Sequence, residues 1–278
     1  MMNAIVCMNR ETKNKWKRSL GLHNYIVLKR IVLFMLSLPF GYNLNKLAAI
    51  YKSDKNGKHA YTQHYHTHFR KFKFKRIKLF EIGAGGYHHL NEGGNSLRMW
   101  KRYFPFGQIV SLDIYDKSFV EERRIKIYQG SQTDEALLNR IVEERGVFDI
   151  IIDDGSHINE HIIQSFKILF PLLKTGGIYV IEDTETSYWP DYGGDSSDLS
   201  NTATAMNFFK NLTDCLNYQE FLKENYTPSY FDKYISSIQF YHNLIFIFKG
   251  LNNEMSSVDV NCPESVMLDK IHYDQIEP

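Results

Sequence analysis

The segment from Phe148 to Asp183 constrains the fold of this chain more than any other. Apolar residues fill 148–152 and again 178–181, and each run has the length of a buried strand. The residues between them, up to about 173, have the pattern of a helix. Two strands joined in this way run parallel, with their C-terminal ends at one edge of a sheet, where open α/β sheets bind ligands. We therefore expect a ligand site immediately after the two strands.

Acidic residues follow both strands. The first strand runs into Asp153, Asp154 and a Gly-Ser-His turn that ends at His157, and the second runs into Glu182 and Asp183. Carboxylates this close repel one another unless a cation lies between them, and all-oxygen ligands select magnesium or calcium. A histidine beside such a cation can take the proton of a bound hydroxyl. The pattern indicates a metal-assisted group-transfer site.

Two structural interpretations compete with this one. Asp154 could instead cap the helix that starts near residue 158, because Asp is a common N-cap residue. His157 could pack or cap at the same helix start, and His161, one turn later, is a rival for the role of base. The residue types leave both alternatives open.

A glycine-rich turn ends an earlier strand. The strand at 77–82 leads into Gly83, an alanine, Gly85 and Gly86, and such glycines let the backbone approach a bound nucleotide closely. The fingerprint G-x-G-x-x-G requires a third glycine at a position where this chain has His88. The turn is therefore not a dinucleotide-binding fingerprint.

The next two strands also end in polar residues. Asp113 follows the strand at 108–112, and its two carboxylate oxygens suit the two hydroxyl groups of a ribose. Ser131 and Gln132 follow the strand at 125–129, at a place where they could contact an adenine edge.

These motifs resemble known families. The turn Glu81-x-Gly83-x-Gly85, followed by a strand that ends in Asp113, resembles the class I S-adenosylmethionine-dependent methyltransferases. Longer runs resemble the magnesium-dependent antibiotic-sugar O-methyltransferases, which act on mycinamicin and on rhamnosylated precursors of tetracenomycin or elloramycin. The similar region covers about 47–250 and contains SLRMWKRYFPFGQI, LDIYDKS, IIIDDGSHINEH, FPLLKTGGIYVIEDTETSYWP and FYHNL.

The resemblance implies a fold, a metal and a cofactor. The fold would be α/β and Rossmann-like, with a mostly parallel seven-stranded sheet flanked by helices and a helical N-terminal extension. Magnesium would bind Asp154, Glu182 and Asp183, and His157 would be the catalytic base. S-adenosylmethionine would contact residues at the ends of the first four strands: Glu81, Gly83, Gly85, Asp113, Ser131, Gln132 and Asp153. Of these, Asp153 and the glycines could instead hold the turn.

We predict three segments along the chain. They are a basic and apolar N-terminal extension at 1–45, a methyltransferase domain at 46–251 and a C-terminal tail at 252–278. Within the extension we expect a loose terminus over 1–23 and a helix over 25–38. The apolar run of this helix is too short to cross a bilayer, so we expect it to be packed or to touch a membrane surface.

Composition limits the partners and the compartment. The 33 basic and 32 acidic residues give a formal charge of +1, which provides no overall attraction to nucleic acid. Three isolated cysteines, Cys7, Cys215 and Cys262, fit a reducing, cytoplasmic compartment. The basic N-terminal extension could contact a membrane, and the resemblance implies a homo-oligomer, either a dimer or a tetramer.

Two further segments allow alternative interpretations. The histidine-rich segment at 59–74 could bind a metal, but Tyr61, Tyr65 and Phe69 share one helical face, which favours aromatic packing. Two β-rich runs at 237–241 and 243–248 form either one long strand or a tight pair.

Between these segments we expect a loop and a helix. The loop that ends at about 201 is long enough to be a substrate lid. A single helix would follow over about 203–222.

The function predicted from these features is S-adenosylmethionine- and magnesium-dependent methyl transfer. The acceptor would be a sugar hydroxyl of a glycosylated molecule, which could be a surface glycan, a glycolipid or a glycosylated natural product. A catechol-like phenol is an alternative acceptor, because its vicinal oxygens would bind the same cation. Alternatives of other classes are an NAD(P)-dependent sugar reductase, against which the missing third glycine argues, and a non-catalytic S-adenosylmethionine-binding protein.

Overall fold

A seven-stranded sheet forms the centre of the computed structural model, which describes residues 10–57, 59–86 and 92–256. The strand order is β3-β2-β1-β4-β5-β7-β6. Strands β1 to β5 are parallel, and β7 is antiparallel to both of its neighbours, so the predicted mostly parallel sheet is confirmed. The strands are β1 (Lys78–Ile82), β2 (Gln108–Asp113), β3 (Ile125–Gln129), β4 (Phe148–Asp153), β5 (Leu173–Glu182), β6 (Ile235–Tyr241) and β7 (Leu244–Lys249).

The register of the strands brings the predicted site residues to one edge. Ile82 at the end of β1 pairs with Leu112 of β2 on one side and with Asp153 of β4 on the other. Asp153 pairs in turn with Ile181 of β5. The segments after β1, β2, β4 and β5 therefore start side by side, as parallel pairing requires.

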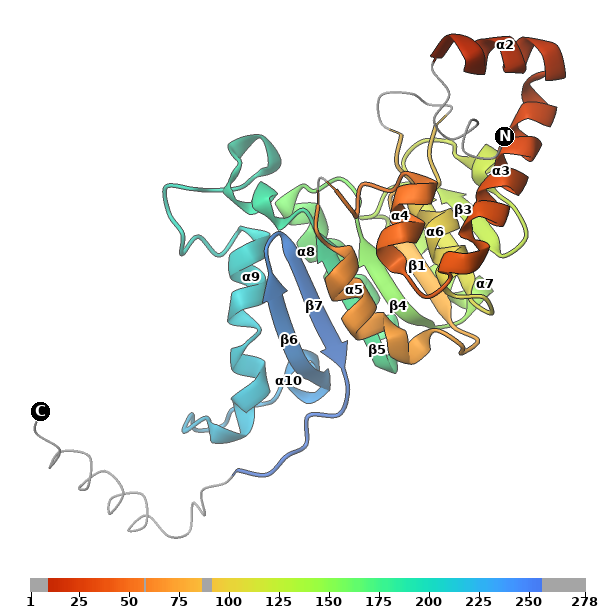
Figure 1. The fold of residues 1–278 in the computed structure, drawn as a ribbon. Coiled ribbons are helices and arrows are strands. Elements are labelled where there is room, and N and C mark those ends of the chain that lie inside the picture. Colours follow the sequence, from red (N-terminus) through yellow and green to blue (C-terminus); the bar gives the residue numbers. More distant parts are fainter. Residues whose placement is uncertain (1–9, 58, 87–91, 257–278) are drawn as a thin grey trace, which may run out of the picture.

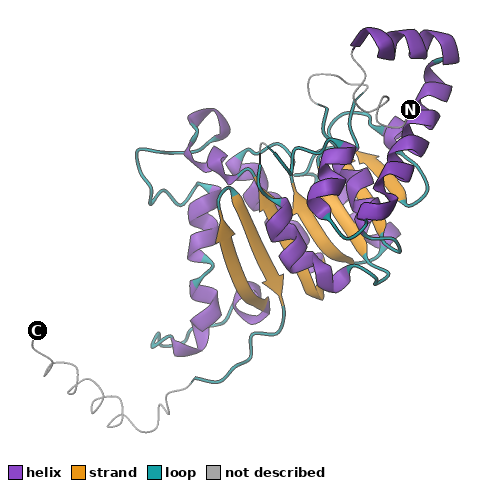
Figure 2. Ribbon diagram, in the orientation of Figure 1, coloured by secondary structure: helices purple, strands orange, loops and turns teal. Residues whose placement is uncertain are grey.

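Helices cover both faces of the sheet (Figure 2). One face packs on α4, α5 and α6, where Tyr65 and Trp100 are fully buried against strand residues such as Ile150. The other face packs on α7, α8 and α9, around Phe166 and Tyr179. The helices are α2 (Arg10–Leu20), α3 (Leu22–Ser37), α4 (Leu44–Tyr51), α5 (Thr62–Phe69), α6 (Asn95–Tyr103), α7 (Glu135–Arg145), α8 (Asn159–Leu172), α9 (Ala205–Asn211) and α10 (Tyr230–Tyr234).

The N-terminal helices stand at one end of the molecule, far from the β6–β7 hairpin (Figure 1). The expected loose terminus over 1–23 is wrong for α2, which is helical, while residues 1–9 lie outside the described residues. Within the described part of the chain no single helix meets the length and apolarity of a membrane span, although the bent pair Asn14–Leu20 and Asn24–Phe40 meets them together. Most of the predicted tail at 252–278, and Cys7 and Cys262, also lie outside the described residues.

Two expectations for the C-terminal part are resolved. The predicted single helix over 203–222 is wrong, because α9 ends at Asn211 and a 3-10 segment (Asp214–Glu220) with a non-helical Asn217 follows. The two β-rich runs form the tight pair, with only His242 and Asn243 between β6 and β7. Asn243 adopts a left-handed φ of 58°, which asparagine tolerates well in a short hairpin turn.

Candidate functional site

The turn between β4 and α8 places Asp154 and His157 at the edge of the sheet. The Asp154 backbone N–H donates to the carbonyl of Ile82 at 3.0 Å, which ties the turn to β1. The Ser156 N–H donates to Oε1 of Gln132 at 2.8 Å. His157 has a left-handed φ of 57°, a conformation that is strained for a non-glycine residue and often marks functional sites.

A buried lysine occupies one side of the acidic cluster. The Lys55 ammonium, with no exposed surface, lies 2.6 Å from Glu182 Oε1, 2.8 Å from Asp154 Oδ2 and 3.0 Å from Glu81 Oε1. The Tyr65 hydroxyl donates a further short hydrogen bond to Glu182 Oε1. A charge this deep in the protein is tolerated only when it is paired, so Lys55 neutralises acids that would otherwise repel one another.

The pKa values of this group follow from the same contacts. Burial opposes the charge of Lys55, but Asp154, Glu182 and Glu81 outweigh that effect and raise the pKa of the ammonium well above its usual value. Burial raises the pKa of Glu182 well above its usual value and that of Glu81 to about 7, against the lowering effect of Lys55. Lys55 therefore opposes the effect of burial on the pKa of these two carboxyl groups but does not cancel it.

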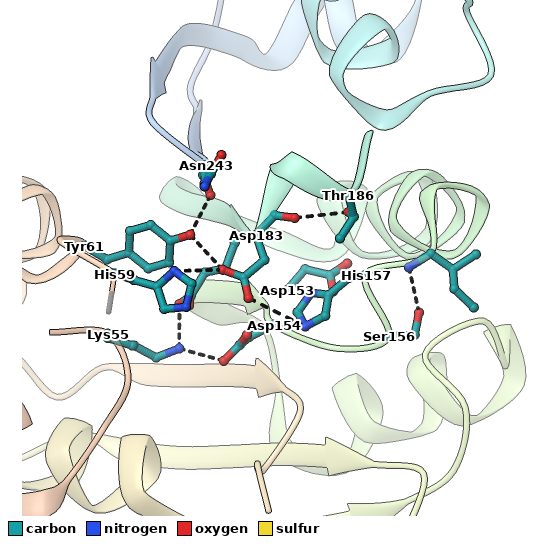
Figure 3. A network of polar contacts seen from close by, with 12 residues as sticks. Lys55, His59, Tyr61, Asp153, Asp154, Ser156, His157, Asp183, Thr186 and Asn243 are labelled. Carbon is teal, nitrogen blue, oxygen red and sulfur yellow. Dashed lines mark hydrogen bonds and ion pairs between the residues drawn. The ribbon is translucent and has the colours of Figure 1, made fainter. Parts of the chain in front are cut away.

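Asp183 lies beside Tyr61, His59 and His157 (Figure 3), and its side chain is 22% exposed. Its φ of 52° is again left-handed. The Tyr61 hydroxyl donates to Asp183 Oδ1 at 2.7 Å, and His59 Nδ1 lies 3.5 Å from the same oxygen. His157 Nε2 lies 3.8 Å from Asp183 Oδ2. Three aromatic or imidazole side chains thus surround this carboxylate.

The predicted magnesium ligands fall into three overlapping groups, and no group holds all three of them. Ligand atoms of Asp154, His157 and Asp183 lie within 4.8 Å of one another, and so do those of Glu81, Asp154 and Glu182, and those of His59, Asp183 and Glu185. The second group already holds the Lys55 ammonium. The side chains of Asp154 and Asp183 are 23% and 22% exposed, so a hydrated hard cation fits the first group.

The glycine turn and Asp113 form a cavity beside this group. The cavity has a volume of about 170 Å³ and lies where the C-terminal ends of β1, β2 and β4 meet. Asp113 accepts the backbone N–H of Ala84 on one oxygen and that of Tyr115 on the other, both at 2.9 Å. The residues that line the cavity are Ile82, Gly83, Leu112, Asp113, Ile114, Gly130, Ser131, Gln132, Gly155, Ser156 and His161.

Glycine at position 83 is required by the local geometry. Its φ is +93°, and a Cβ atom there would lie 2.1 Å from the carbonyl oxygen of Asp154. The backbone of the glycine turn therefore touches the backbone of the acidic turn. The cavity and the acidic cluster share this wall.

The predicted cofactor residues separate into two sets. Gly83, Asp113, Ser131 and Gln132 are among the residues that line the cavity. Gly85, Glu81 and Asp153 are not in that lining: Glu81 contacts Lys55 and Ser96, and Asp153 accepts from Ser165 Oγ at 2.6 Å. These two carboxylates are buried beneath the site and hold it together. Residues 87–91 of the glycine loop lie outside the described residues.

The competing interpretations are also resolved by geometry. The N-cap position of α8 is Ile158, without a side-chain cap, so the interpretation of Asp154 as a helix cap is wrong. His161 Nδ1 lies 3.0 Å from Ser156 Oγ, on the side of the cavity. In the histidine-rich segment, His64 stacks on Tyr241, which agrees with aromatic packing, whereas His59 joins Asp183 and Glu185 in a group that could hold a metal.

Three contacts of the site were not predicted from sequence. Lys55 belongs to a polar turn that carries no motif, and Tyr61 and Tyr65 were assigned to packing alone. Both tyrosines are indeed buried, but their hydroxyls reach Asp183 and Glu182. A tyrosine rather than a phenylalanine at two positions of one buried helical face is the signal that could have indicated polar partners.

Several curated O-methyltransferases are similar to this chain in sequence. Over 214 residues it is 46% identical to mycinamicin VI 2''-O-methyltransferase from Micromonospora griseorubida and 46% identical to demethylmacrocin O-methyltransferase from Streptomyces fradiae. It is 41% identical, over the same length, to a rhamnosyl-tetracenomycin-C 3'-O-methyltransferase from Streptomyces olivaceus. This chain is a relative of the antibiotic-sugar O-methyltransferases. These matches cover 76% of this chain. The chain spans about half the length of each relative, because the matched region covers only 54% to 55% of the relative.

A solved structure extends the comparison to the fold. MycE methyltransferase from the mycinamycin biosynthetic pathway, in complex with Mg and SAH, matches with a TM-score of 0.78 and 43% identity. The match covers 83% of this chain and 60% of MycE. MycE has also been solved with Mg, SAH and mycinamycin VI. The class I methyltransferase fold predicted for this chain is therefore confirmed. No protein-family model matches the chain.

We expect Lys55→Met to destabilise the fold. The substitution leaves Glu81, Asp154 and Glu182 without their buried counter-charge, so the free energy of unfolding in urea should fall by about 3–5 kcal/mol. Added magnesium should raise the melting temperature of this variant more than that of the wild type, because a divalent cation can replace the lost charge. Lys46→Met, at an exposed position of α4, is the control. Equal stability of the two variants would contradict the role assigned to Lys55.

The buried Asp153 predicts a specific pH dependence of stability. Burial raises the pKa of Asp153 to about 6, against the opposing hydrogen bond from Ser165. The folded protein therefore holds this proton more tightly than the unfolded chain, and the stabilisation present below about pH 4 is lost as pH rises through 6. Relative to Asp153→Asn, the wild-type free energy of unfolding should fall by up to about 3 kcal/mol between these pH values. Parallel pH profiles of the two proteins would exclude this role.

Proposed function

We propose that this protein is an S-adenosylmethionine- and magnesium-dependent O-methyltransferase that acts on a sugar hydroxyl of a glycosylated acceptor. One observation carries the proposal: the Gly83 backbone lies against the Asp154 carbonyl, so the cavity at the ends of β1, β2 and β4 and an acidic group with a histidine are direct neighbours. A methyl donor in the cavity and an oxygen nucleophile at the acidic group would then be neighbours, as a direct transfer between them requires. The names of the relatives, all O-methyltransferases, support the same reaction.

The cavity suits the adenosyl part of the donor. S-adenosylmethionine supplies a methyl group on a positively charged sulfur. Each Asp113 oxygen accepts one backbone hydrogen bond and retains a second acceptor position, which a ribose hydroxyl could use. Leu112 and Ile114 provide apolar walls for the base, and Ser131 and Gln132 provide polar edges.

The acidic cluster suits the acceptor. Asp154 and Asp183 would hold the magnesium, together with Glu182, whose contacts with Lys55 and Tyr65 use Oε1 and leave Oε2 for this purpose. When bound, the cation holds two vicinal hydroxyls and stabilises the developing alkoxide. His157, adjacent to Asp183, would take the proton of the attacking hydroxyl. In one in-line displacement the oxygen–methyl bond would form while the methyl–sulfur bond breaks, and S-adenosylhomocysteine would leave as the neutral thioether.

The acceptor class is proposed from chemistry and from the relatives. MycE binds mycinamycin VI, a glycosylated compound, which supports a glycosylated acceptor for this chain. A surface glycan or glycolipid would present the same vicinal hydroxyls as a glycosylated natural product. A catechol-like acceptor would do so through phenol oxygens. Cytoplasmic location and assembly as a homo-oligomer remain predictions of the sequence.

The metal site can be tested without knowing the acceptor. Manganese is a paramagnetic substitute for magnesium, and its binding is followed by the loss of the free-ion signal in electron paramagnetic resonance. We expect the wild type to bind manganese and Asp154→Asn to weaken that binding at least about tenfold, because one ligand charge is removed. Asp191→Asn, at an exposed position, should bind as the wild type does. Unchanged affinity in Asp154→Asn would remove Asp154 from the site.

The catalytic base can be tested with two histidine variants. His157→Ala should lower turnover by about 10²–10⁴-fold while leaving the affinity for S-adenosylhomocysteine unchanged. His161→Ala, which removes the rival histidine from the cavity wall, should keep turnover at saturating cofactor. Turnover is measured on a panel of glycosylated acceptors that includes mycinamycin VI. Normal turnover in His157→Ala together with loss in His161→Ala would reverse the assignment.

A further inference from the structure

A second and larger cavity lies between the N-terminal helix α3 and helix α6. Its volume is about 400 Å³, and none of its lining residues belongs to the cofactor cavity or to the acidic cluster. Arg102 of α6 closes it by donating to Ser37 Oγ and to the Leu38 carbonyl at the end of α3. The lining residues are Arg30, Ile31, Phe34, Tyr51, Arg98, Lys101, Arg102, Pro105, Glu122 and Arg124.

The cavity carries a large excess of positive charge. Five of its lining residues are cationic, and Glu122 is the one acid among them. Lys101, Arg30 and Arg98 all share this carboxylate, at 2.9, 3.5 and 3.9 Å. Three cations cannot be neutralised by one acid, and the remaining two, Arg102 and Arg124, donate to neutral groups.

Hydrogen-bond donors in the cavity also lack acceptors. The Nε atoms of Arg30 and Arg98 are buried and make no hydrogen bond within the described part of the chain, although Arg98 Nε lies 3.9 Å from Glu122 Oε2. Buried donors of this kind destabilise a site unless they are satisfied. The excess of charge calls for an anion with several acceptor oxygens, and phosphate is a group that arginine binds through two parallel hydrogen bonds.

The same helix exposes an apolar face. Val27, Ile31, Phe34 and Met35 of α3, and Leu38 immediately after it, lie at helical spacings, and each is 41% to 54% exposed. Ile31 and Phe34 also line the cavity, so the apolar face and the cationic cavity are continuous. Figure 1 shows α3 at the outer end of the molecule, where an extended surface could reach it.

We propose that α3 and the cationic cavity bind an anionic phospholipid, with the phosphate in the cavity and the exposed face of α3 against the acyl chains. A soluble phosphate ester would explain the charge but would leave the apolar face uncovered. A second copy of this chain would cover the face but would bring the same uncompensated cations against it. An anionic lipid surface satisfies both features at once. The proposal does not depend on methyl transfer.

The test is co-sedimentation with phosphatidylcholine vesicles, with and without phosphatidylglycerol. The wild type should bind only vesicles that contain phosphatidylglycerol, and less at high salt. The variant Arg30→Gln/Lys101→Gln should lose affinity about thirtyfold for the two charges removed. The matched control Arg140→Gln/Lys46→Gln removes the same charges from exposed positions outside the cavity and should bind as the wild type does. The affinity of each variant for S-adenosylhomocysteine checks that it is folded.

A second variant separates the lipid from other occupants. Met35→Ser/Leu38→Ser, outside the cavity lining, should weaken vesicle binding but not the binding of inorganic pyrophosphate measured by calorimetry. Equal vesicle binding by the cavity variant and its control would overturn the proposal. Pyrophosphate binding without vesicle binding would also overturn it and would identify a soluble ligand. A third contradicting result would be a wild type that does not bind vesicles but dimerises with increasing concentration, with the dimer abolished by Met35→Ser/Leu38→Ser.

Discussion

The Lys55 ammonium among three carboxylates is the interaction on which the site depends. Glu81, Asp154 and Glu182 come from the ends of three neighbouring strands, and their charges would repel one another in a buried setting. One lysine from the N-terminal part of the chain makes that arrangement stable and leaves Asp154 and Asp183 on the open side. Asp154 and Asp183, together with Oε2 of Glu182, are the carboxylates proposed for a divalent cation, while Glu81 stays buried against Lys55.

The geometry also explains how two ligands could meet. His157 and Asp183 both have left-handed backbone conformations, and their side chains approach each other. His157 Nε2 lies 3.8 Å from Asp183 Oδ2. The glycine turn lies directly behind Asp154, because a Cβ atom at Gly83 would meet the Asp154 carbonyl. Alignment of a donor and a nucleophile in neighbouring sites is a large part of what a methyltransferase has to supply.

Periodicity predicted the parts of the molecule that depend on local sequence. The strand–helix–strand unit around β4 and β5 and the polar residues at its edge follow from runs of apolar residues and the rules of parallel pairing. Lys55 could not be predicted, because its partner Asp154 is 99 residues away and the turn that carries it looks like any solvated turn. The helix expected over 203–222 breaks because α9 ends at Asn211 and the next turns are 3-10, which the sequence pattern alone does not reveal.

Calorimetric titration with S-adenosylhomocysteine, in magnesium and after chelation, tests the central claim most directly. NADPH serves as the comparison ligand. The account predicts binding of S-adenosylhomocysteine and no binding of NADPH, since the cavity begins at a turn without the third glycine of the dinucleotide fingerprint. Absence of S-adenosylhomocysteine binding under both conditions would contradict the methyltransferase assignment, and the acidic cluster would then be a hydrolytic or structural metal site.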